Sequence, residues 1–103
     1  MPSDLASALE GGNAKEISKR FNSSVELILN HNQDVYGKSQ AEQILKSFFD
    51  TNGPSFKYKD LHSNGKEESH CNFIGSLYTS KGTYRVYIYI KNDQIYQMRM
   101  DND

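Results

Sequence analysis

The sequence has no tryptophan, only one cysteine, and no long run of apolar residues or of charges of one sign. A lone Cys71 excludes an internal disulfide and a zinc cluster built on cysteines. The 12 basic and 13 acidic residues alternate along the chain, so nucleic-acid binding is not expected. Apolar stretches stay far below the roughly 20 residues that span a bilayer, and no export signal opens the chain. We therefore expect a soluble protein without membrane insertion.

Aromatic residues are plentiful by contrast, with seven tyrosines and five phenylalanines. Most of them lie in the second half of the chain, whose composition is typical of β-sheet. A chain of 103 residues has the length of one domain and buries roughly 60 to 65 per cent of the surface of its unfolded form. We therefore expect a single domain over residues 1–103 with one hydrophobic core.

Two short helices are predicted at the start of the chain. Ser3 is placed to cap the first helix, which the Gly-Gly pair at 11–12 ends. Asn13 and Glu16 have the spacing of a capping box at the start of the second.

A longer helix begins near Ser39, which forms a second capping box with Glu42, and the Asn-Gly-Pro sequence at 52–54 ends it. Its apolar face is formed by Ala41, Ile44, Leu45, Phe48 and Phe49.

Strands are predicted on both sides of the long helix. Before it, residues 25–29 alternate in polarity and form a hairpin with a short strand at 35–36. After it, four strands are expected at residues 55–62, 68–79, 83–91 and 94–100, joined by turns at Asn64-Gly65, 81–82 and 92–93. The prediction is an α+β fold of order ααββαββββ, with the helices packed on a curved antiparallel sheet that forms a cone.

The expected strand registers assign a face to each side chain. They pair Ser80 with Thr83 and place a three-residue loop at 91–93. The apolar face then holds Phe56, Tyr58, Asp60, His62, Cys71, Phe73, Leu77, Val86, Ile88, Ile90, Tyr96, Met98 and Met100. The opposite face holds Asn72, Ile74, Ser76, Tyr78, Arg85, Tyr87, Tyr89, Ile95, Gln97 and Arg99.

Three segments carry a resemblance to a known family: SALEGGNAKEISKRFNSSVELIL, VYGKSQAEQILKSFF and IGSLYTSKGTYRVYIYI. They resemble the short bacterial proteins grouped as domain of unknown function 4783. That family's pattern has a helix ending in Gly-Asn, a Tyr-x-x-x-Gln-Ala-Glu helix start and a Thr-x-x-Gly-x-Phe/Tyr-Arg-Val hairpin. The residues that match are Tyr36, Gln40, Ala41, Glu42, Thr79, Gly82, Tyr84, Arg85 and Val86.

The element order resembles the nuclear transport factor 2-like (cystatin-like) superfamily over essentially the whole chain. That resemblance implies a sheet bent around the long helix into a cone with a pocket, and in many members dimers that form through the outer sheet face. The smaller family implies export to the periplasm or cell envelope. The superfamily contains hydrolases, isomerases, polyketide cyclases and many non-enzymes, so the fold does not settle the function.

One group of side chains has potential for acid/base catalysis. Tyr58, Asp60 and His62 alternate on the apolar face of one predicted strand, where a carboxylate could orient an imidazole as a general base. The simpler explanation is that Asp60 and His62 approach a turn and are exposed to water there. The preferred function is a non-catalytic domain that binds a small apolar or amphipathic ligand or a protein, and the alternative is a small hydrolase or isomerase. Tyr36 and Phe48 are expected to line the cone pocket with these three.

Metal and cofactor sites are not expected. The three histidines lie in different segments, without the spacing that metal sites use. Gly11-Gly12 is expected to end a helix and Lys81-Gly82 to turn a hairpin, so no glycine-rich phosphate-binding loop is expected.

Five residues of the polar face are predicted to form an interface: Tyr78, Arg85, Tyr87, Tyr89 and Arg99. The expected register places Arg85 directly opposite Arg99, which is unfavourable in an isolated sheet. Tyrosine and arginine recur at the energetic centres of interfaces. We therefore expect a homodimer through the outer sheet face, and the alternative is a monomer whose tyrosines shield the strand backbone.

Overall fold

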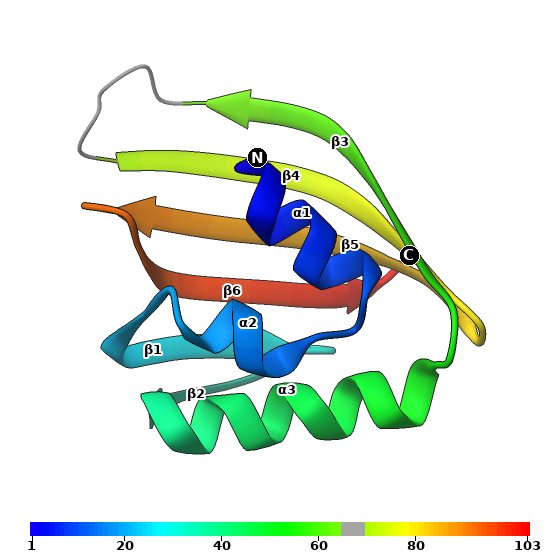
Figure 1. Ribbon diagram of the computed structural model, residues 1–103, viewed down its shortest axis with the longest axis horizontal. Coiled ribbons are helices and arrows are strands. Elements are labelled where there is room, and N and C mark those ends of the chain that lie inside the picture. The colour runs from blue at the N-terminus through cyan, green and yellow to red at the C-terminus, as the bar shows by residue number, and fades with distance from the viewer. Residues whose placement is uncertain (65–69) are drawn as a thin grey trace.

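The computed structural model describes residues 1–64 and 70–103 (Figure 1). The helices are α1 (Ser3–Glu10), α2 (Ala14–Ser18) and α3 (Lys38–Asn52). The strands are β1 (Phe21–Leu29), β2 (Asn32–Gly37), β3 (Phe56–Asn64), β4 (His70–Thr79), β5 (Gly82–Lys91) and β6 (Gln94–Asn102). The predicted α+β class and element order are confirmed. Gly65 of one predicted turn and the predicted strand start at Glu68 lie outside the described residues.

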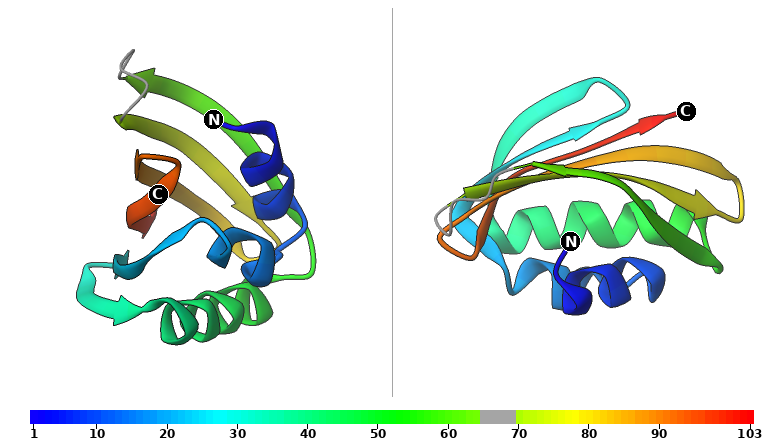
Figure 2. Two further views of the ribbon diagram at one scale, coloured as in Figure 1. Left: turned by 60° about the vertical axis from the view of Figure 1, so that its left-hand side comes forward. Right: turned by 90° about the horizontal axis from the view of Figure 1, so that it is seen from above.

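The six strands form one curved, open sheet of order β2-β1-β6-β5-β4-β3. The pairs β1–β2, β3–β4, β4–β5 and β5–β6 are antiparallel, whereas β1 and β6 run parallel, and β2 and β3 form the two edges of the sheet. All three helices cover the same face of the sheet, as the view from above shows (Figure 2). We call this covered face the inner face and the opposite one the outer face. The inner face therefore carries the core, and no helix among residues 1–64 and 70–103 covers the outer face.

The starts of the helices agree only in part with the predicted caps. In α2 the cap is confirmed, because Asn13 Oδ1 accepts a hydrogen bond from the Glu16 amide at 3.1 Å. In α1, Pro2 occupies the N-cap position and Ser3 is already helical, so the predicted serine cap is wrong. In α3, Gly37 precedes the first turn without a side-chain cap, so Ser39 does not cap that helix either.

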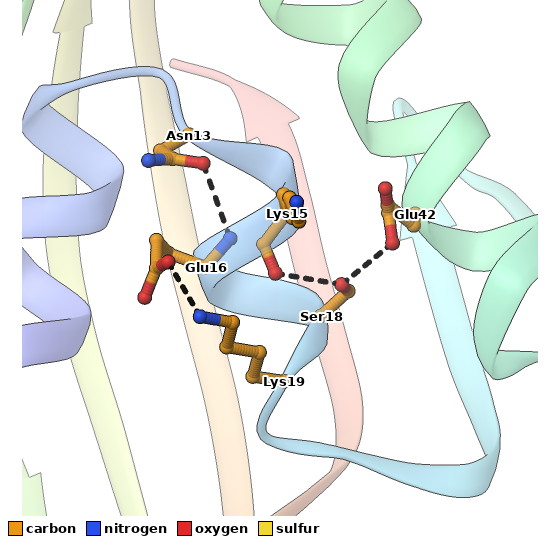
Figure 3. A network of polar contacts seen from close by, with 6 residues as sticks. All are labelled: Asn13, Lys15, Glu16, Ser18, Lys19 and Glu42. Carbon is orange, nitrogen blue, oxygen red and sulfur yellow. Dashed lines mark hydrogen bonds and ion pairs between the residues drawn. The ribbon is translucent and has the colours of Figure 1, made fainter.

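Glu42 ties α3 to α2 instead of closing a capping box. The Ser18 hydroxyl lies 2.9 Å from Glu42 Oε1 and 2.8 Å from the Lys15 carbonyl oxygen, and donates its single proton to one or the other (Figure 3). Ser18 is buried between the helices, where a hydroxyl without a partner would be costly. The contact thus fixes how the short helix lies on the long one.

The long helix buries its apolar stripe against the inner face as predicted. Phe48 is 9% exposed and Phe49 is 4% exposed, which confirms their burial. Their rings meet Tyr84 and Phe56 edge-on, with centroid distances of 4.8 and 5.1 Å. Asn52 fastens the end of the helix, because it accepts a hydrogen bond from the Tyr84 hydroxyl at 3.1 Å and donates one to the Phe48 carbonyl at 2.9 Å.

Two of the predicted turns differ from those of the structure. The β4–β5 hairpin pairs Thr79 with Gly82, so the predicted pairing of Ser80 with Thr83 is displaced by two residues. A shift of two leaves every side chain on its predicted face. The β5–β6 loop has two residues, Asn92 and Asp93, both with positive φ, and not three.

The extra residue of the β5–β6 hairpin is Tyr96, which forms a β-bulge inside β6. Ile95 pairs with Ile90 and is fully buried, so its predicted place on the outer face is wrong. Met98 and Met100 are also fully buried, as predicted. Ile95 and Met98 are three residues apart, and a regular strand would put them on opposite faces. The bulge allows both to enter the core.

We expect Phe49→Ala to lower the free energy of unfolding by about 3 to 5 kcal/mol, because the ring is buried and leaves a cavity. Urea denaturation measures the change. Asp50→Ala is the matched control, since that exposed side chain should change stability by no more than about 0.5 kcal/mol. Equal effects of the two substitutions would contradict the burial of α3 described here.

Candidate functional site

The predicted Asp–His pair on the inner face is not assembled. Asp60 pairs with Gly75 across the sheet, but His62 pairs with Ile74, because Leu61 is an extra residue in a β-bulge. Beyond the bulge, the alternation of side chains between the two faces is shifted by one residue. Asp60 therefore lies on the inner face and His62 on the outer face. The prediction that both share one face is therefore wrong.

Tyr58 and Asp60 remain together at the inner side of β3. The Tyr58 hydroxyl donates a hydrogen bond of 2.8 Å to Asp60 Oδ1. Burial of the ring and this hydrogen bond both raise the pKa of Tyr58 above its ordinary value, so the hydroxyl is protonated at neutral pH. The Tyr58 amide also donates to Glu10 Oε2 at 3.2 Å, which ties the edge strand β3 to α1.

Gly75 makes room for the Tyr58 ring. A Cβ atom on this glycine would overlap the hydroxyl and the ring of Tyr58, which lie across β4 at this point. Glycine is unfavourable inside a strand unless another group needs the space. The Gly75–Tyr58 contact is thus a specific feature of the inner face.

The other two predicted pocket residues lie beside α3 and not in a common cone pocket. Tyr36 lines a hollow of about 220 Å³ between the β1–β2 hairpin and α3. Phe48 lines a second hollow of about 400 Å³, and both hollows include Leu29 and Ile44. The five residues predicted to line one pocket are therefore distributed over three places: Tyr36 and Phe48 here, Tyr58 and Asp60 at β3, and His62 on the outer face.

A larger hollow of about 530 Å³ lies on the outer face, and we call it the outer hollow. It is lined by His62, Asn72, Phe73, Ile74, Tyr87, Ile88, Tyr89, Gln97 and Arg99. These residues come from β3, β4, β5 and β6, and most of them were assigned to the outer face by sequence alone. The sequence did not group them as a hollow, and it missed His62 because no signal marks the bulge at Leu61.

The two arginines of the outer face have acidic partners in the same chain. Arg85 pairs with Asp101 across the sheet and Arg99 with Tyr87, so the predicted opposition of the two arginines is wrong by two residues. Arg99 Nε lies 2.5 Å from Asp101 Oδ2, and an Arg85 terminal nitrogen lies 3.1 Å from Asp103 Oδ2. The two-residue β5–β6 turn accounts for one residue of this displacement and the bulge at Tyr96 for the other. Together they separate the two arginines and place Asp101 opposite Arg85, which relieves the expected repulsion.

Aromatic and amide groups complete the surroundings of the outer hollow. The Arg99 guanidinium lies 5.9 Å from the centre of the Tyr87 ring, a cation–π distance. Tyr87 is 37% exposed, and Tyr78, further along the same face, is 44% exposed. The amide nitrogens of Gln97 and Gln33 both donate to Glu26, and these bonds lower the pKa of its carboxyl group. The face combines rigid polar groups with exposed rings.

Within residues 1–64 and 70–103, no three histidine, cysteine or acidic side chains are grouped so that they could hold a metal ion. In the same ranges, no helix has the length and apolar character required to cross a bilayer.

Three helices on one face of a curved, open six-stranded sheet define the nuclear transport factor 2-like, or cystatin-like, fold. The chain belongs to the family described as Domain of unknown function (DUF4783), which matches residues 2–101. No curated protein matches it.

Solved structures agree with this assignment. A DUF4783 family protein from Bacteroides uniformis is 28% identical, with a TM-score of 0.88 over 100% of this chain and 97% of that one. A DUF4783 family protein from Bacteroides fragilis is 25% identical, with a TM-score of 0.90 over 100% and 99% of the two chains. An NTF2-like protein of unknown function from Cytophaga hutchinsonii shares the fold at 14% identity, with a TM-score of 0.67 over 98% and 85%.

We expect Gly75→Ala to destabilise the protein by about 1 to 3 kcal/mol, because the added methyl group displaces the Tyr58 ring. In a Tyr58→Ala background the same substitution should cost far less, because the space is then empty. A double-mutant cycle in urea measures the coupling, which we expect to be at least about 0.5 kcal/mol. The same cost in both backgrounds would show that the ring does not depend on the glycine.

Proposed function

We propose that this chain is a non-catalytic binding or interaction domain that works through the outer face of its sheet, and that two copies associate through this face. The observation that carries the proposal is the outer hollow with the exposed Tyr87 ring beside it. The helices cover the inner face, whereas no helix of the described residues covers this one (Figure 2). A two-fold axis would let one self-complementary patch serve both copies.

The pairing of charges on this face supports its burial. Tyrosine and arginine are enriched among the residues that contribute most of the binding free energy of an interface. Burying an unpaired guanidinium would be costly, but Arg85 and Arg99 each already have an acid in contact. A second copy therefore does not have to supply countercharges and can contribute rings and shape. The alternative is a monomer whose exposed tyrosines shield the strands.

The catalytic alternative has less support, because the sheet separates its two central residues. A general base oriented by a carboxylate needs the two groups within hydrogen-bond reach, and Asp60 and His62 lie on opposite faces. Tyr58 and Asp60 alone leave a protonated phenol beside an exposed carboxylate. No observation therefore favours a hydrolase or isomerase over a binding role.

A small apolar or amphipathic ligand is a second candidate partner. The two adjoining hollows beside α3 share Leu29 and Ile44 and include Tyr36 and Phe48, two of the residues predicted to line a pocket. Apolar cavities of comparable size accept molecules as small as benzene. We propose this crevice, in place of the expected cone interior, as the position for such a ligand.

Membership of the family also supports a proposal about the cellular location of the protein. The resemblance implies a periplasmic or envelope location, and we propose that the protein is exported. Fractionation of cells that produce the full gene product tests this, and recovery in the cytoplasm alone would contradict it.

We expect light scattering of the purified chain at micromolar concentration to give the mass of two chains, because the proposed contact joins the outer faces of two copies. Tyr87→Glu should reduce the mass to one chain, since it places a carboxylate at the centre of the contact. Leu61→Glu is the control, because it adds the same charge at an exposed apolar residue that does not line the outer hollow. A wild-type mass of one chain would contradict the dimer.

A further inference from the structure

The outer hollow has one permanently charged side chain in its wall, the guanidinium of Arg99. Arg99 and His62 line it, and its lining residues, all of them described, include no carboxylate. A site lined by one sign of charge attracts ligands of the other sign. The wall thus favours an anionic group.

Arg99 is held in a position suited to binding such a group. Its Nε donates to Asp101 at 2.5 Å, and its guanidinium lies 5.9 Å from the Tyr87 ring centre. Its two terminal nitrogens have no hydrogen-bond partner in the described part of the chain. Asp101 offsets the charge but uses only one of five donors. A fixed guanidinium with two free terminal nitrogens matches the geometry of a carboxylate.

The remaining wall offers contacts to an apolar body. The rings of Tyr87 and Tyr89 and the side chain of Ile74 lie on neighbouring strands β5 and β4. The Tyr89 ring makes an edge-on contact with the Tyr96 ring, and the two ring centroids lie 6.4 Å apart. Gln97 donates its amide nitrogen to Glu26, which leaves its carbonyl oxygen as an acceptor. The hollow thus combines an anion-binding end with aromatic walls.

We propose that the outer hollow binds a small monocarboxylate that carries an aromatic or similarly sized apolar group. The carboxylate lies on the terminal nitrogens of Arg99, and the ring lies against Tyr87 and Tyr89. A volume of about 530 Å³ is ample for such a molecule. The inference rests on one part of the proposed function, namely that the outer face is a binding surface. It does not require that two copies associate.

A titration followed by amide NMR tests the proposal, with benzoate as the probe and benzyl alcohol as its uncharged counterpart. At low ionic strength benzoate should shift the amides of β4, β5 and β6 around the hollow and saturate. Benzyl alcohol should bind at least about tenfold more weakly, because it lacks the charge-assisted pair. Equal binding of the two, or no shift around the hollow, would overturn the proposal. Phenyl phosphate is a third probe, and tighter binding of it than of benzoate would overturn the choice of a carboxylate.

Two arginine variants locate the carboxylate. Arg99→Lys keeps the charge but loses the planar pair of donors, and we expect benzoate affinity to fall about tenfold. Arg85→Lys is the matched control, because Arg85 contacts Asp103 and does not line the hollow, and its effect should stay within about twofold. Equal losses in both variants would show that general surface charge, and not the hollow, attracts the anion.

Light scattering on the same samples separates this inference from the proposed dimer. If the wild type has the mass of one chain, the dimer fails while benzoate binding is still tested directly. Tyr78→Glu places a charge on the outer face without altering the lining of the hollow. Suppose that the wild type is a dimer, that Tyr78→Glu is a monomer, and that benzoate binds only to the monomer. The second copy then occupies the hollow in the wild type, and this outcome overturns the ligand site.

Discussion

A strand alternates its side chains strictly between two faces, and two β-bulges interrupt that alternation in this sheet. The bulge at Tyr96 lets Ile95 and Met98 enter the same core although they are three residues apart. The bulge at Leu61 turns the end of β3 over and moves His62 to the outer face. The contents of both faces depend on these two extra residues.

The electrostatics of the outer face follow from the first of them. Because the two-residue turn and the bulge at Tyr96 each displace the expected register by one residue, Arg99 lies opposite Tyr87, and Asp101 lies opposite Arg85. An expected repulsion between two arginines becomes an arrangement in which each has an acidic neighbour. Arg99 then lies in the outer hollow together with Tyr87 and Tyr89, and its terminal nitrogens have no hydrogen-bond partner among the described residues.

The inner face depends on close packing between the sheet and the helices. Phe49 and its neighbours on α3 bury their rings, and Asn52 and Tyr84 close the end of the helix with hydrogen bonds. At β3 the ring of Tyr58 crosses β4 above Gly75, where a side chain would collide with it. These contacts leave Tyr58 as a structural aromatic residue that holds a hydrogen bond to Asp60.

The sequence by itself determined the class, the order of the elements and the burial of Phe48 and Phe49, because these depend on local periodicity and on glycine, proline and asparagine at turns. It also placed Tyr87 and Arg99 on the outer face correctly, since a shift of two residues preserves the face. Only the tertiary structure decided that Asp60 and His62 separate and that the two arginines do not meet. A bulge arises where the sheet must reconcile its pairing with the core, and no local pattern at Leu61 or Tyr96 encodes that compromise.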